Sequence, residues 1–217
     1  VLIDEEDIGL VAKPSPEAPG LEVVPATIDL SGAELQLVDV KGRERRLRKA
    51  LRKYLKNHDV DYVILDCPPS LGLLTLNALV AADEVLVPIQ CEYYALEGVT
   101  QLMRTIEAVR HAMNKELRLG SILMTMFDGR TRLSTQVDEE VRTHFARETM
   151  STRIPRSVRV SEAPSYSRSV LTYEPTSAGA VAYREATAEF AKRHAGDEHS
   201  TNTSGVKHPD VSDTKKG

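Results

Sequence analysis

One stretch of eleven residues, Tyr62 to Gly72, constrains this chain more than any other. It reads Tyr-Val-Ile-Leu-Asp-Cys-Pro-Pro-Ser-Leu-Gly. β-Prone apolar residues precede Asp66, and the prolines that follow it require a turn. An unbroken apolar run of this kind is typical of a strand buried on both faces in a parallel sheet. The sequence therefore predicts a strand over residues 62–65 that ends at a carboxylate.

The place of Asp66 after this run indicates a possible chemistry. The carboxyl ends of parallel strands form the crevice in which open α/β sheets bind ligands. A carboxylate there can hold Mg²⁺ or its waters beside a nucleotide phosphate, which is the role of a Walker B aspartate. The competing interpretation is a solvated aspartate at a strand end, and the hydrophobic pattern alone does not decide between the two.

The phosphate-binding loop that such an aspartate accompanies is absent from the sequence. A Walker A loop needs a glycine-rich turn followed by lysine and a hydroxyl residue. No glycine among the 217 residues is followed directly by lysine. We therefore expect either that nucleotide binding has been lost or that the chain begins downstream of the loop. The opening Val1-Leu2-Ile3-Asp4 reads as the middle of an element, which favours a fragment or a mis-started reading frame.

Composition limits the classes of protein to consider. A chain of 217 residues that is 41% apolar and 28% charged fits one α/β domain, or at most two small ones. Its net charge of −4 means that any DNA binding must come from local basic clusters. Cys67 and Cys91 have no CxxC spacing, which argues against zinc and disulfides and favours a reducing cytoplasm. No apolar run approaches the roughly 20 residues of a membrane helix, and the sequence has no basic-then-apolar pattern of the signal-peptide kind.

Apolar runs and helical periodicities alternate along the chain. This alternation predicts βαβ units and a mostly parallel sheet. Residues 1–195 are expected to form one domain, and the polar residues 196–217 a disordered tail. The expected strands are residues 21–25, 62–65, 84–89, 121–126 and 150–154. The expected helices are residues 73–82, 93–114, 133–147 and 177–194, with a helical turn near residues 28–31.

A further helix is expected in the strongly basic segment that begins at Lys41. Between Lys41 and Lys53 the chain has eight basic residues and one acidic residue. Apolar residues recur there at helical spacing, so the segment is an amphipathic helix with a basic outer face. A solvated surface is the favoured interpretation of that face.

Two further turns follow predicted strands. Residues 126–131 read Met-Phe-Asp-Gly-Arg-Thr and lie between a strand and a helix. Residues 154–164 read Ile-Pro-Arg-Ser-Val-Arg-Val-Ser-Glu-Ala-Pro, and the stretch from Arg153 to Arg168 has four arginines and one acid. Both turns are therefore expected at the ligand-facing edge of the sheet.

Together with residues 66–72, these turns closely resemble the ParA/Soj family of chromosome- and plasmid-partitioning ATPases. The resemblance also includes residues 25–34, Pro-Ala-Thr-Ile-Asp-Leu-Ser-Gly-Ala-Glu, and it extends from near Val1 to about Ala195. It implies an α/β, doubly wound fold of the P-loop NTPase type. In that family the chain opens with a glycine-rich lysine loop, followed by a strand whose aspartate positions the attacking water. Neither is present here, so we expect an N-terminally truncated domain.

The resemblance implies roles for individual residues. Asp66 resembles the Walker B carboxylate that holds Mg²⁺. The adenine contacts would come from the turn after one strand and from the end of another, and two arginines would bind DNA phosphates without sequence preference. The implied switch residues are Pro68, Pro69, Ser70 and Gly72; the implied nucleotide residues are Asp128, Pro155, Arg156, Ser157 and Val158; the implied DNA residues are Arg130 and Arg159. Arg156 could face either the nucleotide or DNA.

The function that this resemblance implies is ATP-driven DNA segregation. ATP and Mg²⁺ would bind between two subunits, the dimer would bind nucleoid DNA in the cytoplasm, and a ParB-type partner would stimulate hydrolysis. Without the Walker A loop, we expect this chain to be inactive alone. The alternative is a truncated, non-catalytic module that binds DNA or a partner. The membrane-associated relative MinD ends in an amphipathic helix, whereas this chain ends in a polar tail, so we do not favour a membrane role.

Overall fold

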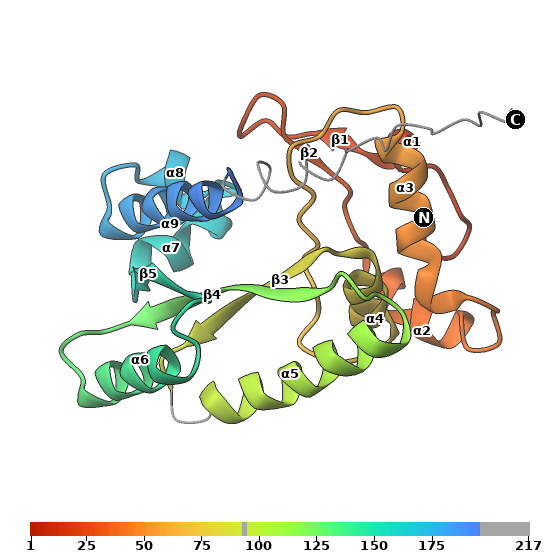
Figure 1. The fold of residues 1–217 in the computed structure, drawn as a ribbon. Helices are drawn as coiled ribbons and strands as arrows, with labels where there is room; N and C mark the ends of the chain where they lie inside the picture. The colour runs from red at the N-terminus through yellow and green to blue at the C-terminus, as the bar shows by residue number, and fades with distance from the viewer. Residues whose placement is uncertain (93–94, 196–217) are drawn as a thin grey trace, which may run out of the picture.

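The computed structural model describes residues 1–92 and 95–195. Its centre is a three-stranded parallel sheet in the order β3-β4-β5, so β4 lies in the middle. A separate two-stranded antiparallel sheet, β1 and β2, lies nearer the N-terminus (Figure 1). The strands are β1 (Lys13–Pro14), β2 (Glu22–Val23), β3 (Glu84–Gln90), β4 (Arg118–Phe127) and β5 (Thr149–Pro155).

Helices cover both faces of the parallel sheet (Figure 1). The longer ones are α3 (Arg46–Leu55), α4 (Leu73–Ala81), α5 (Ala95–Ala112), α6 (Arg132–His144) and α9 (Ala178–Ala195). The short ones are α1 (Ile8–Val11), η1 (Ile28–Gly32), α2 (Ala33–Gln36), η2 (Arg43–Arg45), α7 (Val158–Glu162), η3 (Ala163–Tyr166) and α8 (Val170–Tyr173). The α/β architecture predicted from the sequence is confirmed, and so are all the helices expected beyond residue 72 within the described range.

Strand β4 is buried on both faces because its side chains alternate between two cores. Ile122 and Met124 pack with β3, α5 and α6, whereas Leu123 packs with β5 and α9. Consecutive residues of a strand point to opposite faces, so this uninterrupted apolar run fits the centre of a covered sheet. The core therefore fixes the carboxyl ends of all three strands relative to one another.

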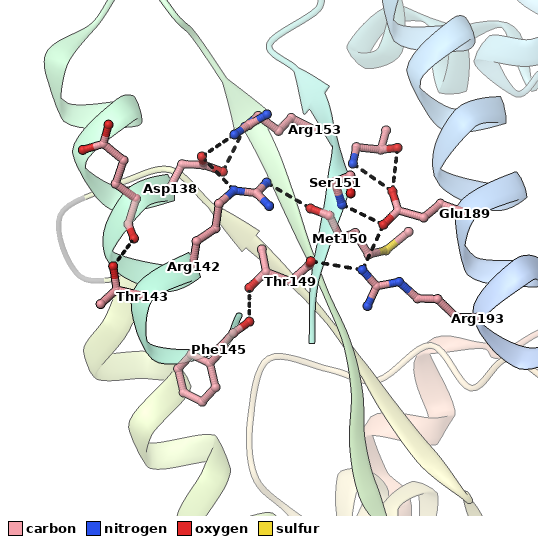
Figure 2. A network of polar contacts seen from close by, with 12 residues as sticks. Asp138, Arg142, Thr143, Phe145, Thr149, Met150, Ser151, Arg153, Glu189 and Arg193 are labelled. Atoms are coloured by element: carbon pink, nitrogen blue, oxygen red, sulfur yellow. Dashed lines mark hydrogen bonds and ion pairs between the residues drawn. The ribbon is translucent and has the colours of Figure 1, made fainter. Parts of the chain in front are cut away.

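The outer edge of β5 is covered by α9, as Figure 2 shows. Glu189 accepts hydrogen bonds from the backbone N–H groups of Ser151 (2.7 Å) and Thr152 (2.9 Å). Arg193 donates to the carbonyl oxygen of Thr149 (3.0 Å) and to Glu189 (2.9 Å). An exposed strand edge leaves backbone groups unpaired, and here helix side chains pair them instead of a further strand.

The strand predicted over residues 62–65 is wrong. Residues 58–72 contain neither helix nor strand, and the Ile64 side chain is 86% exposed. The Tyr62 ring lies against α9, 6.1 Å from the Phe190 ring. A strand exists only through hydrogen bonds to a neighbouring strand, and within the described residues the sheet holds only β3, β4 and β5. An apolar run without such a neighbour stays irregular.

Two other expectations differ in extent. The strand predicted over residues 21–25 is shorter, Glu22–Val23, and pairs with β1 in the antiparallel sheet. The basic segment forms η2 and α3, as predicted, and the helical turn near residues 28–31 is η1. The tail predicted to be disordered, residues 196–217, lies outside the described residues, and so does the predicted start of the helix at Tyr93. Within the described part of the chain, no helix is both long and apolar enough to cross a membrane.

Candidate functional site

A cavity of about 890 Å³ lies at the carboxyl ends of β3 and β4 and next to the end of β5. One wall is apolar, and a small number of polar side chains face the same space, which is the usual character of a small-molecule site. The apolar lining includes Val87, Ile89, Val99, Leu102, Met126 and Leu133. The polar lining includes Glu92, Asp128, Thr131, Ser134 and Arg156.

Cys91 also lines this cavity. Burial raises the pKa of its thiol to about 11, and the Asp138 carboxylate acts in the same direction. The thiol is therefore protonated at neutral pH. It contributes to the apolar wall and has no nucleophilic character there.

The turn after β4 positions Asp128. Met126 adopts the left-handed region at φ 53°, which redirects the chain at the end of the strand. The Thr131 hydroxyl donates to the Asp128 carbonyl oxygen (3.0 Å) and accepts from the Ser134 N–H (3.3 Å), so it caps α6. This capped turn holds the Asp128 side chain at the cavity.

Asp128 is paired with Arg130. The guanidinium donates to both carboxylate oxygens, at 2.9 and 2.8 Å, and the Arg130 N–H donates at 3.1 Å. These bonds lower the pKa of Asp128 to about 2, so it is an anion at neutral pH. The sequence assigned Asp128 to the nucleotide and Arg130 to DNA. The ion pair means that a change at either residue alters the surroundings of the other.

The end of β5 brings Arg156 to the same cavity. Its backbone N–H donates to the Phe127 carbonyl oxygen (3.0 Å), which ties the end of β5 to that of β4. The Arg156 guanidinium lies 3.6 Å from the carboxylate of Glu92, which is two residues beyond the end of β3. One charged side chain from beyond each of the three strands thus faces this space.

The other predicted nucleotide residues are neighbours of Arg156 in the sequence, but they do not belong to the described lining of the cavity. Pro155 is the last residue of β5, and Ser157 precedes α7. Val158 begins α7 with 71% of its side chain exposed. The structure thus brings Asp128 and Arg156 together at the cavity, whereas Pro155, Ser157 and Val158 lie at the junction between β5 and α7.

Asp66 and the predicted switch residues form an exposed loop before α4. The Thr75 hydroxyl donates to the carbonyl oxygens of Ser70 (2.6 Å) and Pro68 (3.4 Å). Gly72 lies so close to Glu34 that a Cβ added there would come within 2.1 Å of a carboxylate oxygen, so a larger residue would have to displace the Glu34 carboxylate. Asp66 is exposed, and neither it nor residues 68–72 belong to the described lining of the cavity.

The residues present fit a nucleotide only in part. An apolar wall with Asp128 and Arg156 suits a heterocyclic base. The glycine-rich lysine loop that binds phosphate does not occur in the sequence. In the described part of the chain, no group of three or more histidine, cysteine, aspartate or glutamate side chains could hold a metal ion.

The two predicted DNA arginines are on the surface. The Arg130 side chain is 90% exposed and that of Arg159 is 54% exposed. Each is held by a carboxylate: Arg130 by Asp128, and Arg159 by Glu162 at 2.9 Å. Arg130 belongs to the turn after β4 and Arg159 to α7, which follows β5, so both lie on the side of the molecule where these strands end.

Sequence reasoning missed two groups of residues. Glu92 could have been found, because it lies two residues beyond the end of β3, as Asp128 lies just beyond the end of β4. The buried Asp138 could not, because its partners come from different elements. It accepts from Arg142 of α6 (3.0 Å) and from Arg153 of β5 (2.6 Å), which joins α6 to the edge of the sheet (Figure 2).

A family model described as "AAA domain" matches residues 1–119. Three relatives with assigned names are close in sequence. The sporulation initiation inhibitor protein Soj of Bacillus subtilis is 47% identical over 191 residues, covering 88% of this chain and 74% of that protein. The chromosome partitioning protein ParA of Myxococcus xanthus is 51% identical over 173 residues, covering 80% and 60%. ParA of Caulobacter vibrioides is 50% identical over 177 residues, covering 82% and 66%. The chain thus spans between three fifths and three quarters of these relatives.

Solved structures show the same fold. Cobyrinic acid a,c-diamide synthase from Mycobacterium smegmatis, with bound ADP and magnesium, superposes with a TM-score of 0.71 at 37% identity, covering 98% of this chain and 75% of that one. The cell division ATPase MinD of Pyrococcus furiosus has a TM-score of 0.67 at 19% identity, covering 90% and 73%. The second likeness concerns the fold alone.

Proposed function

The chain belongs to the ParA/Soj family of partitioning ATPases, and we propose that it carries the base-binding and DNA-binding parts of such an ATPase. The observation that carries this proposal is the meeting of Asp128 and Arg156 in one cavity at the carboxyl ends of the sheet. Both residues come from motifs through which the sequence resembles the family. Nucleotide with magnesium is present in a solved structure of the same fold, which supports a nucleotide as the ligand.

In the proposed site the adenine base lies against the apolar wall, and Asp128 and Arg156 orient it. Asp128 is ionised at neutral pH, so it can accept hydrogen bonds from an exocyclic amino group. Pro155, Ser157 and Val158 form the turn beside the base. Bound ATP would supply the phosphoanhydride bond whose hydrolysis drives segregation, and Mg²⁺ would neutralise the phosphate charge.

Asp66 is proposed to orient the magnesium ion, and Pro68, Pro69, Ser70 and Gly72 to form the switch. Such segments respond to nucleotide by ordering around the phosphate. The exposed loop before α4 has few contacts that would oppose this. Such a movement would break the hydrogen bonds that the Thr75 hydroxyl donates to the carbonyl oxygens of Ser70 and Pro68.

DNA binding is proposed to use Arg130 and Arg159 in an ATP-dependent homodimer on the nucleoid, with hydrolysis stimulated by a ParB-type partner. Arginine pairs with phosphate oxygens at every position along a duplex, so the binding is independent of sequence. Both guanidiniums are exposed, and each would exchange its carboxylate partner for a phosphate.

A second candidate function is a non-catalytic module that binds DNA or a partner. The observation that favours it is the absence of a Gly-Lys pair from the sequence. Phosphate affinity in this fold comes mainly from the loop N–H groups and the lysine. The purified chain alone is then expected to bind ATP no more tightly than adenosine. Isothermal titration of both ligands with Mg²⁺ tests this, and micromolar ATP binding with measurable hydrolysis would favour the ATPase instead.

The DNA role of Arg159 can be tested with a matched control. Arg159→Ala is expected to weaken binding equally for unrelated duplexes and to lower the log–log salt slope by about one unit per lost phosphate contact. Arg104→Ala removes another exposed arginine, on α5, and is expected to change neither. Fluorescence anisotropy with random duplexes at several salt concentrations provides the measurement. Equal slopes for wild type and Arg159→Ala would remove this residue from the DNA surface.

A further inference from the structure

A second strongly charged surface lies on α3, far from the cavity. Its residues form a groove of about 700 Å³ that we call the α3 basic groove. Figure 1 places α3 at the opposite end of the molecule from α6 and α7, so this groove is separate from Arg130, which precedes α6, and from Arg159 of α7. The groove is lined by Arg45, Arg48, Lys49, Arg52, Lys53, Lys56 and Met113.

The cations of this groove fall into two rows with different partners. Lys49 and Lys53 form ion pairs with Glu5 (2.9 Å) and Asp7 (2.8 Å) in the N-terminal segment. No ion pair within the described residues involves the remaining four cations of the groove, although the Arg48 guanidinium donates to the Met113 carbonyl oxygen (3.3 Å). These four are Arg45, Arg48, Arg52 and Lys56.

The unpaired row follows one stripe of the helix. Its members are three, four and four residues apart, and side chains at that spacing lie on the same face. Like charges so placed repel one another and destabilise an isolated helix. A bound polyanion would relieve this repulsion. The row spans roughly 16 Å at about 1.5 Å per residue, and that length of duplex carries roughly nine phosphate charges.

The helix holds this stripe in a fixed place, because its opposite side is anchored. Asn77 of α4 accepts from the Leu47 N–H (3.2 Å) and donates to the Arg43 carbonyl oxygen (2.9 Å). The buried Tyr54 donates to Glu22 (2.7 Å). A fixed array of cations loses less entropy on binding than a mobile one.

We propose that the α3 basic groove binds the phosphate backbone of double-stranded nucleic acid. Arginine predominates in its unpaired row, and the guanidinium fork matches phosphate oxygens. Met113 is the single apolar residue of the lining, so the groove lacks the aromatic and aliphatic anchors of a protein interface or a membrane surface. It also lacks the aromatic platforms on which single strands stack. This inference is independent of the proposed ATPase function, because it requires neither nucleotide nor dimer.

The test compares two triple variants that remove the same charge. Arg45→Ala/Arg52→Ala/Lys56→Ala removes three of the four cations of the unpaired row and leaves Arg48, which donates to the Met113 carbonyl oxygen. Arg104→Ala/Arg147→Ala/Lys192→Ala removes two arginines and one lysine from other exposed positions. Each is titrated, without nucleotide, with a random 24-base-pair duplex at several salt concentrations. The first variant is expected to lose about two to three units of log–log salt slope, and the second to keep the wild-type slope.

The same pair of variants is then placed in the Arg130→Ala/Arg159→Ala background. The α3 variant is expected to lower the remaining affinity there as well, which separates this groove from the proposed DNA surface. Equal slopes for the two triple variants in either background would overturn the proposal. The proposal would also be overturned if the α3 variant bound the duplex like wild type but lost binding to a polyglutamate peptide or to phosphatidylserine vesicles.

Discussion

Strand β4 and residues 62–65 are both apolar, β-prone runs that lead to an aspartate, yet only β4 forms a strand. Ile122 in β4 is completely buried, whereas Ile64 is 86% exposed. The difference lies outside the two runs. β4 has β3 on one side and β5 on the other, and helices cover both of its faces. An apolar run thus becomes a strand only where neighbouring backbone is available to pair with it.

The largest expected effect comes from making the same substitution in both runs. Ile122→Ala removes buried methyl groups from a close-packed core and should lower the free energy of unfolding by about 2–5 kcal/mol. Ile64→Ala should change it by less than about 0.5 kcal/mol, because the side chain is already in water. Urea denaturation followed by circular dichroism measures both. Similar losses for the two variants would mean that residues 62–65 are packed like a strand.

The second-largest expected loss of stability concerns Glu189 of α9, which covers the outer edge of β5. Burial acts to raise the pKa of Glu189, but hydrogen bonds from Ser151, Thr152 and Arg193 outweigh it and hold the pKa at about 2, below the ordinary 4.5. A depressed carboxyl pKa stabilises the fold above the unfolded value, and this stability is lost as pH falls through the folded value. Glu189→Gln should therefore cost about 2–3 kcal/mol at pH 7 and progressively less between pH 4.5 and pH 2.

The control for that experiment is Glu185→Gln, which changes an exposed glutamate one turn earlier on α9. Its effect should be small at every pH. Denaturant unfolding at a series of pH values records the two profiles. A loss for Glu189→Gln that stays constant from pH 7 to pH 2 would contradict the assigned carboxylate bonds.

A smaller effect distinguishes the aspartates of the two regions. Asp138→Asn removes the charge that joins Arg142 and Arg153, and it should lower the free energy of unfolding by about 1–3 kcal/mol. Asp66→Asn should leave stability within about 0.5 kcal/mol of wild type, because this aspartate is exposed. Thermal unfolding of both variants makes the comparison. A destabilised Asp66→Asn variant would reveal a structural role for that carboxylate.

Sequence patterns predicted the part of the fold in which neighbouring elements in the chain are also neighbours in space. From Glu84 to Ala195 the strands and the longer helices follow the expected order, since each βαβ connection returns the chain to the same sheet. The short helices α7, η3 and α8 were not predicted, because the segment that contains them was read as a turn. Because the carboxyl ends of parallel strands lie at the same edge of a sheet, the sequence also placed Asp128 and Arg156 together at that edge. The same expectation failed for Asp66, because the place of its run depends on pairing with a distant segment, which no local pattern encodes.

The side-chain contacts of the site were beyond sequence reasoning. That Asp128 is held by Arg130 depends on how far a guanidinium can reach across a turn, and the sequence shows only that the two are close in the chain. The Asp138 network needs the registry of α6 against β5. The individual roles of Asp66, Asp128, Arg130, Arg156 and Arg159 remain predictions until variants are measured.

The central claim is that the cavity at the carboxyl ends of the sheet binds an adenine base, and chemical-shift mapping with adenosine tests it most directly. Titration of isotope-labelled chain should shift the amide signals of Asp128, Thr131, Ser134 and Arg156, which surround the cavity. The signals of residues 66–72 should stay unchanged, because adenosine has no phosphate for that loop to bind. Shifts confined to residues 66–72, or none near Asp128 and Arg156 at millimolar adenosine, would contradict the claim.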